Sequence, residues 1–222
     1  MARESRLGAN VQLPSMRATA KAWPTELVCD HHSAAGPVVT AVRGTMLVSS
    51  VGTIRELGLY ERYYACLPEA MREQVLYTLA MSWSPIEVAI AHYEACDRMG
   101  LRDEEIAEIG ARVSGRFANT FLGTLLGSAR GAGVDAPWLG LRAQPRSWDR
   151  MFMGGGARIE RVGPKDVIGT FTGTPLARIR YYRQSFCGYY RGLAKLFGHQ
   201  AHVKVIGDRG DRDTLRVSGS WV

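Results

Sequence analysis

The chain has 222 residues, of which 46% are hydrophobic and 22% charged, and its formal net charge is +7. This composition is typical of a globular protein with a sizeable core, and it excludes a low-complexity or fibrous chain. No apolar stretch approaches the roughly 18 residues that span a bilayer, and residues 1–23 lack the apolar region of a secretory signal, so we expect a cytoplasmic protein.

The first part of the chain shows no sustained period. Residues 1–39 scatter Gly, Pro, Ser and Ala, and they are predicted to form a flexible N-terminal arm with one docked segment near residues 23–28. Helical periodicity starts near residue 41 and lasts to about residue 148. A first helix over residues 43–57 repeats Leu47, Val51 and Ile54 on one face, and a second follows Pro68.

Two further helices carry start signals. In the run SWSP, Ser84 suits the N-cap and Pro85 the first helical position, and the helix is expected to stop at Gly100. The next helix opens with the acidic residues 103–105, which suit the positive end of the helix dipole. It is predicted to reach the glycine-rich run at residues 127–133.

From about residue 157 the pattern changes to short alternating stretches. ARIERVG and DVIGTFTG, separated by Gly163 and Pro164, predict one hairpin, and HVKVI with TLRVSGSW predict another. A helix over residues 176–197 lies between them. The expected fold is therefore α+β: an N-terminal helical bundle packed on a four-stranded antiparallel sheet of order β-β-α-β-β, in one domain of residues 40–222.

The helix over residues 176–197 has two distinct faces at 100° per residue. One side gathers Tyr182, Phe186, Tyr189, Tyr190, Leu193, Leu196 and Phe197. The opposite side gathers Arg180, Arg183, Arg191 and Lys195. The apolar side must pack on the sheet, and the basic side is interpreted as a solvated surface, with contact to phosphates or an acidic partner as the alternative.

Four segments carry a resemblance to a known family. VRGTM, SPIEVAIAHYEACDRMG, IGARVSGRFANTFLGTLLG and CGYYRGLAKLFGHQAHVKV resemble a paralogous family of unknown function in myxobacteria. The order of elements is also similar to the 4-vinyl reductase domain, to small TRAPP subunits and, more distantly, to haem nitric-oxide-binding (H-NOX) sensors. The resemblance implies an apolar pocket between helices and sheet that holds an aromatic effector, an acyl chain or haem, and it implies a homodimer.

These features favour a regulatory or sensory module that binds a small apolar or aromatic ligand, and they indicate no enzyme, because no catalytic motif is present in context. The predicted pocket-lining residues are His92, Tyr93, Phe117, Phe121, Phe186 and Tyr189. Three alternatives stay open: a protein-interaction scaffold with a filled core, a haem-based sensor, and a weak nucleic-acid binder suggested by the net charge.

Histidines and cysteines are the candidate ligands for haem or a metal ion. His92 and Cys96 are four residues apart on one helix face, a spacing that suits two metal ligands or a haem-binding histidine. Haem-binding relatives pair their histidine with a YxSxR signature, which RYYRQSF does not match. The four cysteines form no CxxC pair, so we expect free thiols, no metal site and no cofactor, with haem as the alternative.

Cys187 is a candidate reactive thiol. Arg183 and Arg191 lie one helical turn away on either side. Positive charge stabilises a thiolate, so one interpretation of Cys187 is a reactive thiol of lowered pKa, and the alternative is a small residue tolerated on the flank of the helix.

Overall fold

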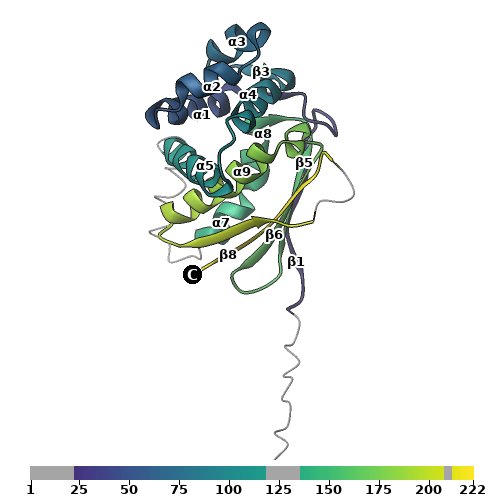
Figure 1. The fold of residues 1–222 in the computed structure, drawn as a ribbon. Helices are drawn as coiled ribbons and strands as arrows, with labels where there is room; N and C mark the ends of the chain where they lie inside the picture. Colours follow the sequence, from purple (N-terminus) through teal and green to yellow (C-terminus); the bar gives the residue numbers. More distant parts are fainter. Residues whose placement is uncertain (1–22, 119–135, 208–211) are drawn as a thin grey trace, which may run out of the picture.

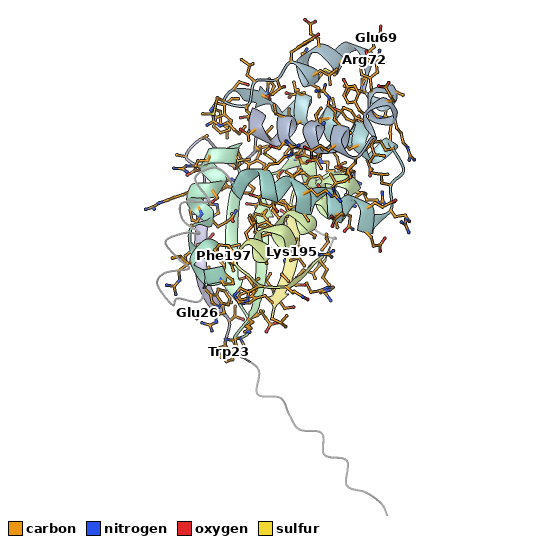
Figure 2. The ribbon with its side chains drawn as sticks, turned by 90° about the vertical axis from the view of Figure 1, so that its left-hand side faces the viewer. Trp23, Glu26, Glu69, Arg72, Lys195 and Phe197 are labelled. Atoms are coloured by element: carbon orange, nitrogen blue, oxygen red, sulfur yellow. The ribbon has the colours of Figure 1, made fainter. Side chains whose placement is uncertain are left out.

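The computed structural model describes residues 23–118, 136–207 and 212–222 of the chain. Helices from the first half of the chain gather at one end of the molecule, and a larger sheet crossed by a long helix forms the other (Figure 1). Figure 2 shows Glu69 and Arg72 at the helical end and Trp23 and Glu26 at the opposite end. The combination of helices with antiparallel strands confirms the predicted α+β class.

The helices of the first half agree with the sequence pattern in order and place. Their bounds are α1 Gly44–Glu56, α2 Tyr60–Cys66, α3 Glu69–Leu76, α4 Ile86–Arg98 and α5 Asp103–Ala118. α4 begins one residue later than SWSP predicts, because Ser84 and Pro85 belong to a short strand and no side chain caps the helix. The Ile86 amide instead donates to the Thr40 carbonyl at 2.9 Å. No helix in the described ranges is long and apolar enough to cross a bilayer.

A small antiparallel sheet links the two ends of the molecule. Its order is β3-β2-β4, with β2 at Ala41–Arg43, β3 at Trp83–Pro85 and β4 at Phe152–Met153. It joins the segments before α1 and α4 to the segment after α8 (Gln144–Met151). Strands of two or three residues are too short to show alternation, so this sheet was not predictable from the sequence pattern.

The main sheet has the order β1-β5-β6-β8-β7, and every neighbouring pair is antiparallel. Its strands are β1 Glu26–His32, β5 Gly156–Arg161, β6 Asp166–Thr172, β7 Ala201–Val205 and β8 Leu215–Trp221. The other elements are α7 Ala136–Arg142, η1 Pro175–Arg178 and α9 Arg180–Leu196. Both predicted hairpins are confirmed, since β5 pairs with β6 and β7 pairs with β8.

β1 corrects two predictions: a flexible arm with one docked segment near residues 23–28, and a main sheet of four strands. Its residues pair with β5 from Glu26–Arg161 to His32–Gly156, so the sheet has five strands and the ordered fold begins before residue 40. The run ELVCDHH does not show the alternation that predicts a strand, because only Val28, Cys29 and His31 are partly buried.

α9 lies between the sheet and α5 (Figure 1). Its contact with α5 is made by backbone. A Cβ added to Gly188 would lie 1.9 Å from the carbonyl oxygen of Ala107, and one added to Gly110 would lie 2.0 Å from that of Ser185. Only glycine permits two helices to approach so closely.

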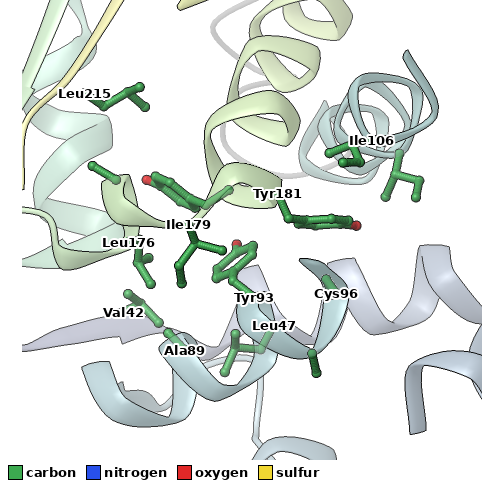
Figure 3. Close-up of a cluster of buried hydrophobic side chains, with 14 of the residues drawn as sticks. Val42, Leu47, Ala89, Tyr93, Cys96, Ile106, Leu176, Ile179, Tyr181 and Leu215 are labelled. Carbon is green, nitrogen blue, oxygen red and sulfur yellow. The ribbon is translucent and has the colours of Figure 1, made fainter. Parts of the chain in front are cut away.

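One hydrophobic core joins the helical end to the sheet. Figure 3 shows Ile179 and Tyr181, which flank the first residue of α9, beside Tyr93 of α4. Leu47 of α1 and Leu215 of β8 belong to the same core, and both are almost fully buried. Both halves of the chain therefore surround a common interior.

Candidate ligand pocket

A cavity of about 200 Å³ lies between α9, the main sheet and the short helices α7 and α8. At one end its lining includes Met46 and Ser50 of α1 and Tyr93 of α4. At the other end it includes Val203 of β7 and Trp221 of β8. The cavity thus lies where helices and sheet meet, which is a common location for ligand sites.

Aromatic rings form much of the cavity wall. α9 contributes Tyr181, Tyr182, Phe186, Tyr189 and Tyr190, and Phe197 follows at its end. The Phe186 ring centre is 5.0 Å from that of Tyr190 and 4.7 Å, edge-on, from that of Phe171. The Trp148 ring stacks on Phe152 at 4.3 Å. Rings packed in this way fix one another, so the wall is preformed.

The polar groups of the wall are neutral: hydroxyls, an amide and two indole N–H groups. Gln144 accepts a hydrogen bond from the Tyr190 hydroxyl at 2.9 Å. The indole N–H of Trp221 is buried without an acceptor among the described residues. None of the described lining residues is charged. An ionised ligand would lose its hydration here without gaining a counter-ion, so the lining suits a neutral molecule.

Three of the six predicted lining residues reach the cavity: Tyr93, Phe186 and Tyr189. Burial raises the pKa of Tyr189 to about 12, which keeps its hydroxyl neutral. His92 is not in the lining. The side chain of Phe117 and the whole of Phe121 fall outside the described residues, so those two assignments stay predictions.

His92 lies behind the wall in a buried hydrogen-bond network. The Tyr63 hydroxyl is 2.8 Å from its Nδ1 and the Ser50 hydroxyl is 2.9 Å from its Nε2. The Cys96 Sγ is 3.8 Å from the same Nε2. A neutral imidazole donates from one nitrogen and accepts at the other, so these two hydroxyls use both. Burial lowers the pKa of His92 to about 3, so the ring is neutral at pH 7.

The structure contradicts the prediction of a lowered pKa at Cys187. The thiol is buried, and burial raises its pKa to about 11 although Arg191 acts in the opposite direction. Both neighbouring arginines are directed to backbone carbonyls: Arg191 donates to Val203 at 2.8 Å and Arg183 to Ala177 at 2.9 Å. A buried thiol of high pKa is a poor nucleophile.

Several lining residues were not predicted. Alternation in TLRVSGSW places Leu215, Val217 and Trp221 on one face of β8, and all three are buried, so Trp221 could have been found from the inner face of the predicted hairpin. Ser50 and Gln144 also line the cavity, but no motif distinguishes them from other polar helix residues.

Helices gathered on one side of an antiparallel sheet, with a cavity between them, define the architecture of this chain. Among solved structures, H-NOX domains have a similar fold. The unliganded Fe(II) H-NOX protein from K. algicida matches with a TM-score of 0.55 and 7% identity, over 81% of this chain and 96% of that one. A point mutant of T. tengcongensis H-NOX matches with a TM-score of 0.54 and 15% identity, over 81% and 97%.

A third similar structure is the oxygen complex of an oxygen-binding H-NOX domain related to soluble guanylate cyclases. It matches with a TM-score of 0.51 and 16% identity, over 81% of this chain and 94% of that one. No protein-family model and no curated protein matches the sequence. At these identities the likeness shows a shared fold, which confirms the distantly H-NOX-like architecture. The resemblances to the myxobacterial family, the 4-vinyl reductase domain and TRAPP subunits stay predictions.

The described residues around the cavity do not fit a haem. They include no histidine and no cysteine, and His92 already uses both ring nitrogens. A tyrosinate ligand is disfavoured, since burial raises the pKa of Tyr93 and of Tyr190 well above the ordinary value. No lysine or arginine in the described lining is placed to pair with the carboxylates of haem.

The volume of the cavity and the arrangement of metal-ligating residues also argue against a haem. About 200 Å³ is below the roughly 300 Å³ at which drug-sized pockets begin. In the described ranges no three His, Cys, Asp or Glu side chains come together as metal ligands.

Proposed function

We propose that this chain is a non-enzymatic sensory module that binds a small, neutral, apolar or aromatic molecule between α9 and the sheet. The observation that carries the proposal is the cavity, whose wall combines packed rings with neutral polar groups. An empty apolar cavity of this size lowers stability by on the order of 5 kcal/mol relative to a filled core. A ligand that fills it recovers part of that free energy.

Affinity in such a site comes from the rings, and orientation comes from a few polar groups. Tyr93, Tyr189 and the Gln144–Tyr190 pair are the groups that would orient a ligand. The buried indole N–H of Trp221 offers a hydrogen bond to an acceptor that approaches it.

Thermal unfolding tests the proposal with naphthalene, indole and 2-naphthol, and with 2-naphthoate as the charged counterpart. A ligand at about 100 times its Kd stabilises the folded state by about 2.7 kcal/mol. For a chain of this length the Tm rises by roughly 5–10 °C. We expect the neutral molecules to raise the Tm and 2-naphthoate to raise it much less, because the described lining has no cation.

Ala194→Phe supplies the blocking variant, because Ala194 lines the cavity and a phenyl group there occupies it. Lys195→Gln is the matched control, since Lys195 is exposed on the next position of α9. The neutral ligands should lose their effect in Ala194→Phe and keep it in Lys195→Gln. Absence of any shift in the wild-type chain contradicts the proposal and favours the scaffold with a filled core.

A haem-based sensor is the second candidate, and the shared fold is what favours it. One of the similar structures concerns haem redox potential and porphyrin distortion, at a TM-score of 0.51. Titration with hemin and a visible spectrum decide between the two. We expect no Soret shift beyond that of free hemin. A shifted band that disappears in His92→Gln would assign haem binding to this chain and displace the first candidate.

A further inference from the structure

The cavity between α9 and the sheet has a polar end, where residues of α1, α4 and α9 come together. Ser50 of α1, Tyr93 of α4 and Tyr181 of α9 line this end, and all three are buried. The ring centres of Tyr93 and Tyr181 are 6.3 Å apart, and Figure 3 shows the two rings side by side. The hydrogen bonds that the Ser50 and Tyr181 hydroxyls can still make determine which ligand atoms fit here.

The Tyr181 hydroxyl is buried and has no hydrogen-bond partner among the described residues. Burial raises its pKa well above the ordinary value, so it keeps its hydrogen. Cys96 and Ser50 are close enough to act on this pKa as well, but neither makes a hydrogen bond of ordinary length and angle with the hydroxyl. A buried hydroxyl without a partner lowers stability, and a ligand atom that accepts its hydrogen removes that penalty.

Ser50 ends a buried chain of hydrogen bonds. The Tyr63 hydroxyl contacts Nδ1 of His92, and the Ser50 hydroxyl contacts Nε2. Neutral His92 carries one ring hydrogen, so the chain runs in one of two directions. If His92 donated to Tyr63, the Tyr63 hydrogen would have no acceptor, because Tyr63 is fully buried away from the cavity and His92 is its only hydrogen-bond partner in the described ranges. The favoured direction is therefore from Tyr63 to His92 to Ser50.

In this direction Ser50 accepts from His92, and the hydrogen of its own hydroxyl finds no acceptor in the described part of the chain. Ser50 and Tyr181 are thus two neighbouring donors at one end of the cavity. One oxygen with two lone pairs accepts from both. An alcohol would bring a further hydrogen that needs an acceptor, and a carboxylate would find no cation in the described lining.

We propose that the ligand of this cavity carries an uncharged carbonyl oxygen, as an aryl ketone or aldehyde does, and that this oxygen accepts hydrogen bonds from Ser50 and Tyr181. The inference rests on the proposed function, because it specifies the ligand of the same cavity. The rings of the wall hold the apolar part of the molecule, and the two hydroxyls set which end of it points toward α1.

Acetophenone and α-methylstyrene test the proposal, since they differ only in the carbonyl oxygen that replaces a CH₂ group. The rise of Tm over a series of ligand concentrations gives the Kd of each for the full chain. Tyr181→Phe and Ser50→Ala should each weaken acetophenone binding about five- to tenfold, because each removes one hydrogen bond. Both variants should leave the Kd of α-methylstyrene unchanged. Without ligand, Tyr181→Phe should unfold at the wild-type temperature or above it, because the hydroxyl that it removes has no partner.

Ser49→Ala is the matched control for Ser50→Ala. Ser49 is the neighbouring position of α1, and it is buried outside the lining of the cavity. The same substitution there should leave the binding of both ligands as in the wild-type chain.

Equal loss of the two ligands in Tyr181→Phe would show that the hydroxyl acts through the shape of the cavity, and it would overturn the proposal. Acetophenone binding that neither variant weakens would overturn it too. In both cases α-methylstyrene still binds the wild-type chain, so the proposed function stands. If neither ligand binds the wild-type chain, the proposed function fails together with this inference.

Discussion

At the scale of single residues, His92 makes the stability of the protein depend on pH. Its ring is buried and neutral, with a pKa of about 3 in the folded chain, whereas an unfolded chain has a histidine pKa near 6.5. Above pH 6.5 both states are neutral. As the pH falls below 6.5 only the unfolded state gains the proton, so the free energy of unfolding decreases by up to about 1.4 kcal/mol per pH unit.

Urea unfolding between pH 7 and pH 5 measures this effect. His92→Gln keeps an amide donor and acceptor near Tyr63 and Ser50 but removes the titrating group, so its stability should be lower at pH 7 and depend less on pH. His202→Gln is the control, because His202 is exposed on β7, and it should retain the wild-type slope. Equal slopes in wild type and His92→Gln would contradict the burial of a neutral imidazole.

At the scale of elements, the contact between α5 and α9 depends on glycine. A methyl group on Gly188 would meet the Ala107 carbonyl oxygen at 1.9 Å, so the helices must move apart. Gly188→Ala should lower the free energy of unfolding by about 3 kcal/mol, as for other overpacked interiors. Chemical denaturation measures the change.

Gly115 provides the comparison within α5. A Cβ there meets nothing within 4 Å, so Gly115→Ala should stabilise the protein by about 0.5–1 kcal/mol through helix propensity alone. If Gly188→Ala were as favourable as Gly115→Ala, the two backbones would not be in contact.

α9 shows which contacts of a helix can be predicted from its own sequence. Period 3.6 predicted the aromatic face of α9, and Tyr182, Phe186, Tyr189 and Tyr190 indeed line the cavity. The opposite face was interpreted as solvated, yet Gly188 on that side packs against α5. A glycine in a helix pattern looks like a weak position until its neighbour is known, because the sequence does not say which backbone approaches it.

At the scale of the whole molecule, local pattern predicted the α+β class and both hairpins, whereas long-range pairing was not predictable. β1 is stabilised by β5, which lies far along the chain, and by contacts such as His31 Nε2 to Asp149 Oδ1 at 2.8 Å. The run ELVCDHH contains no pattern that predicts β5 or Asp149 as a partner. The cavity likewise results from how elements fit together, so Tyr93 could be predicted as an aromatic on a buried face, but Ser50 could not.

The cavity wall joins distant parts of the chain, with Ser50 in α1 at one end and Trp221 in β8 at the other. A ligand that fills the cavity should therefore slow local opening at both ends. With 2-naphthol bound, hydrogen exchange followed by mass spectrometry should show slower amide exchange in α1 and in β8 than in the free protein. α3 contributes no residue to the lining, so amides of α3 that exchange by local opening should be unaffected. Protection confined to β8, or equal protection in α3, would mean that the ligand sits elsewhere than between helices and sheet.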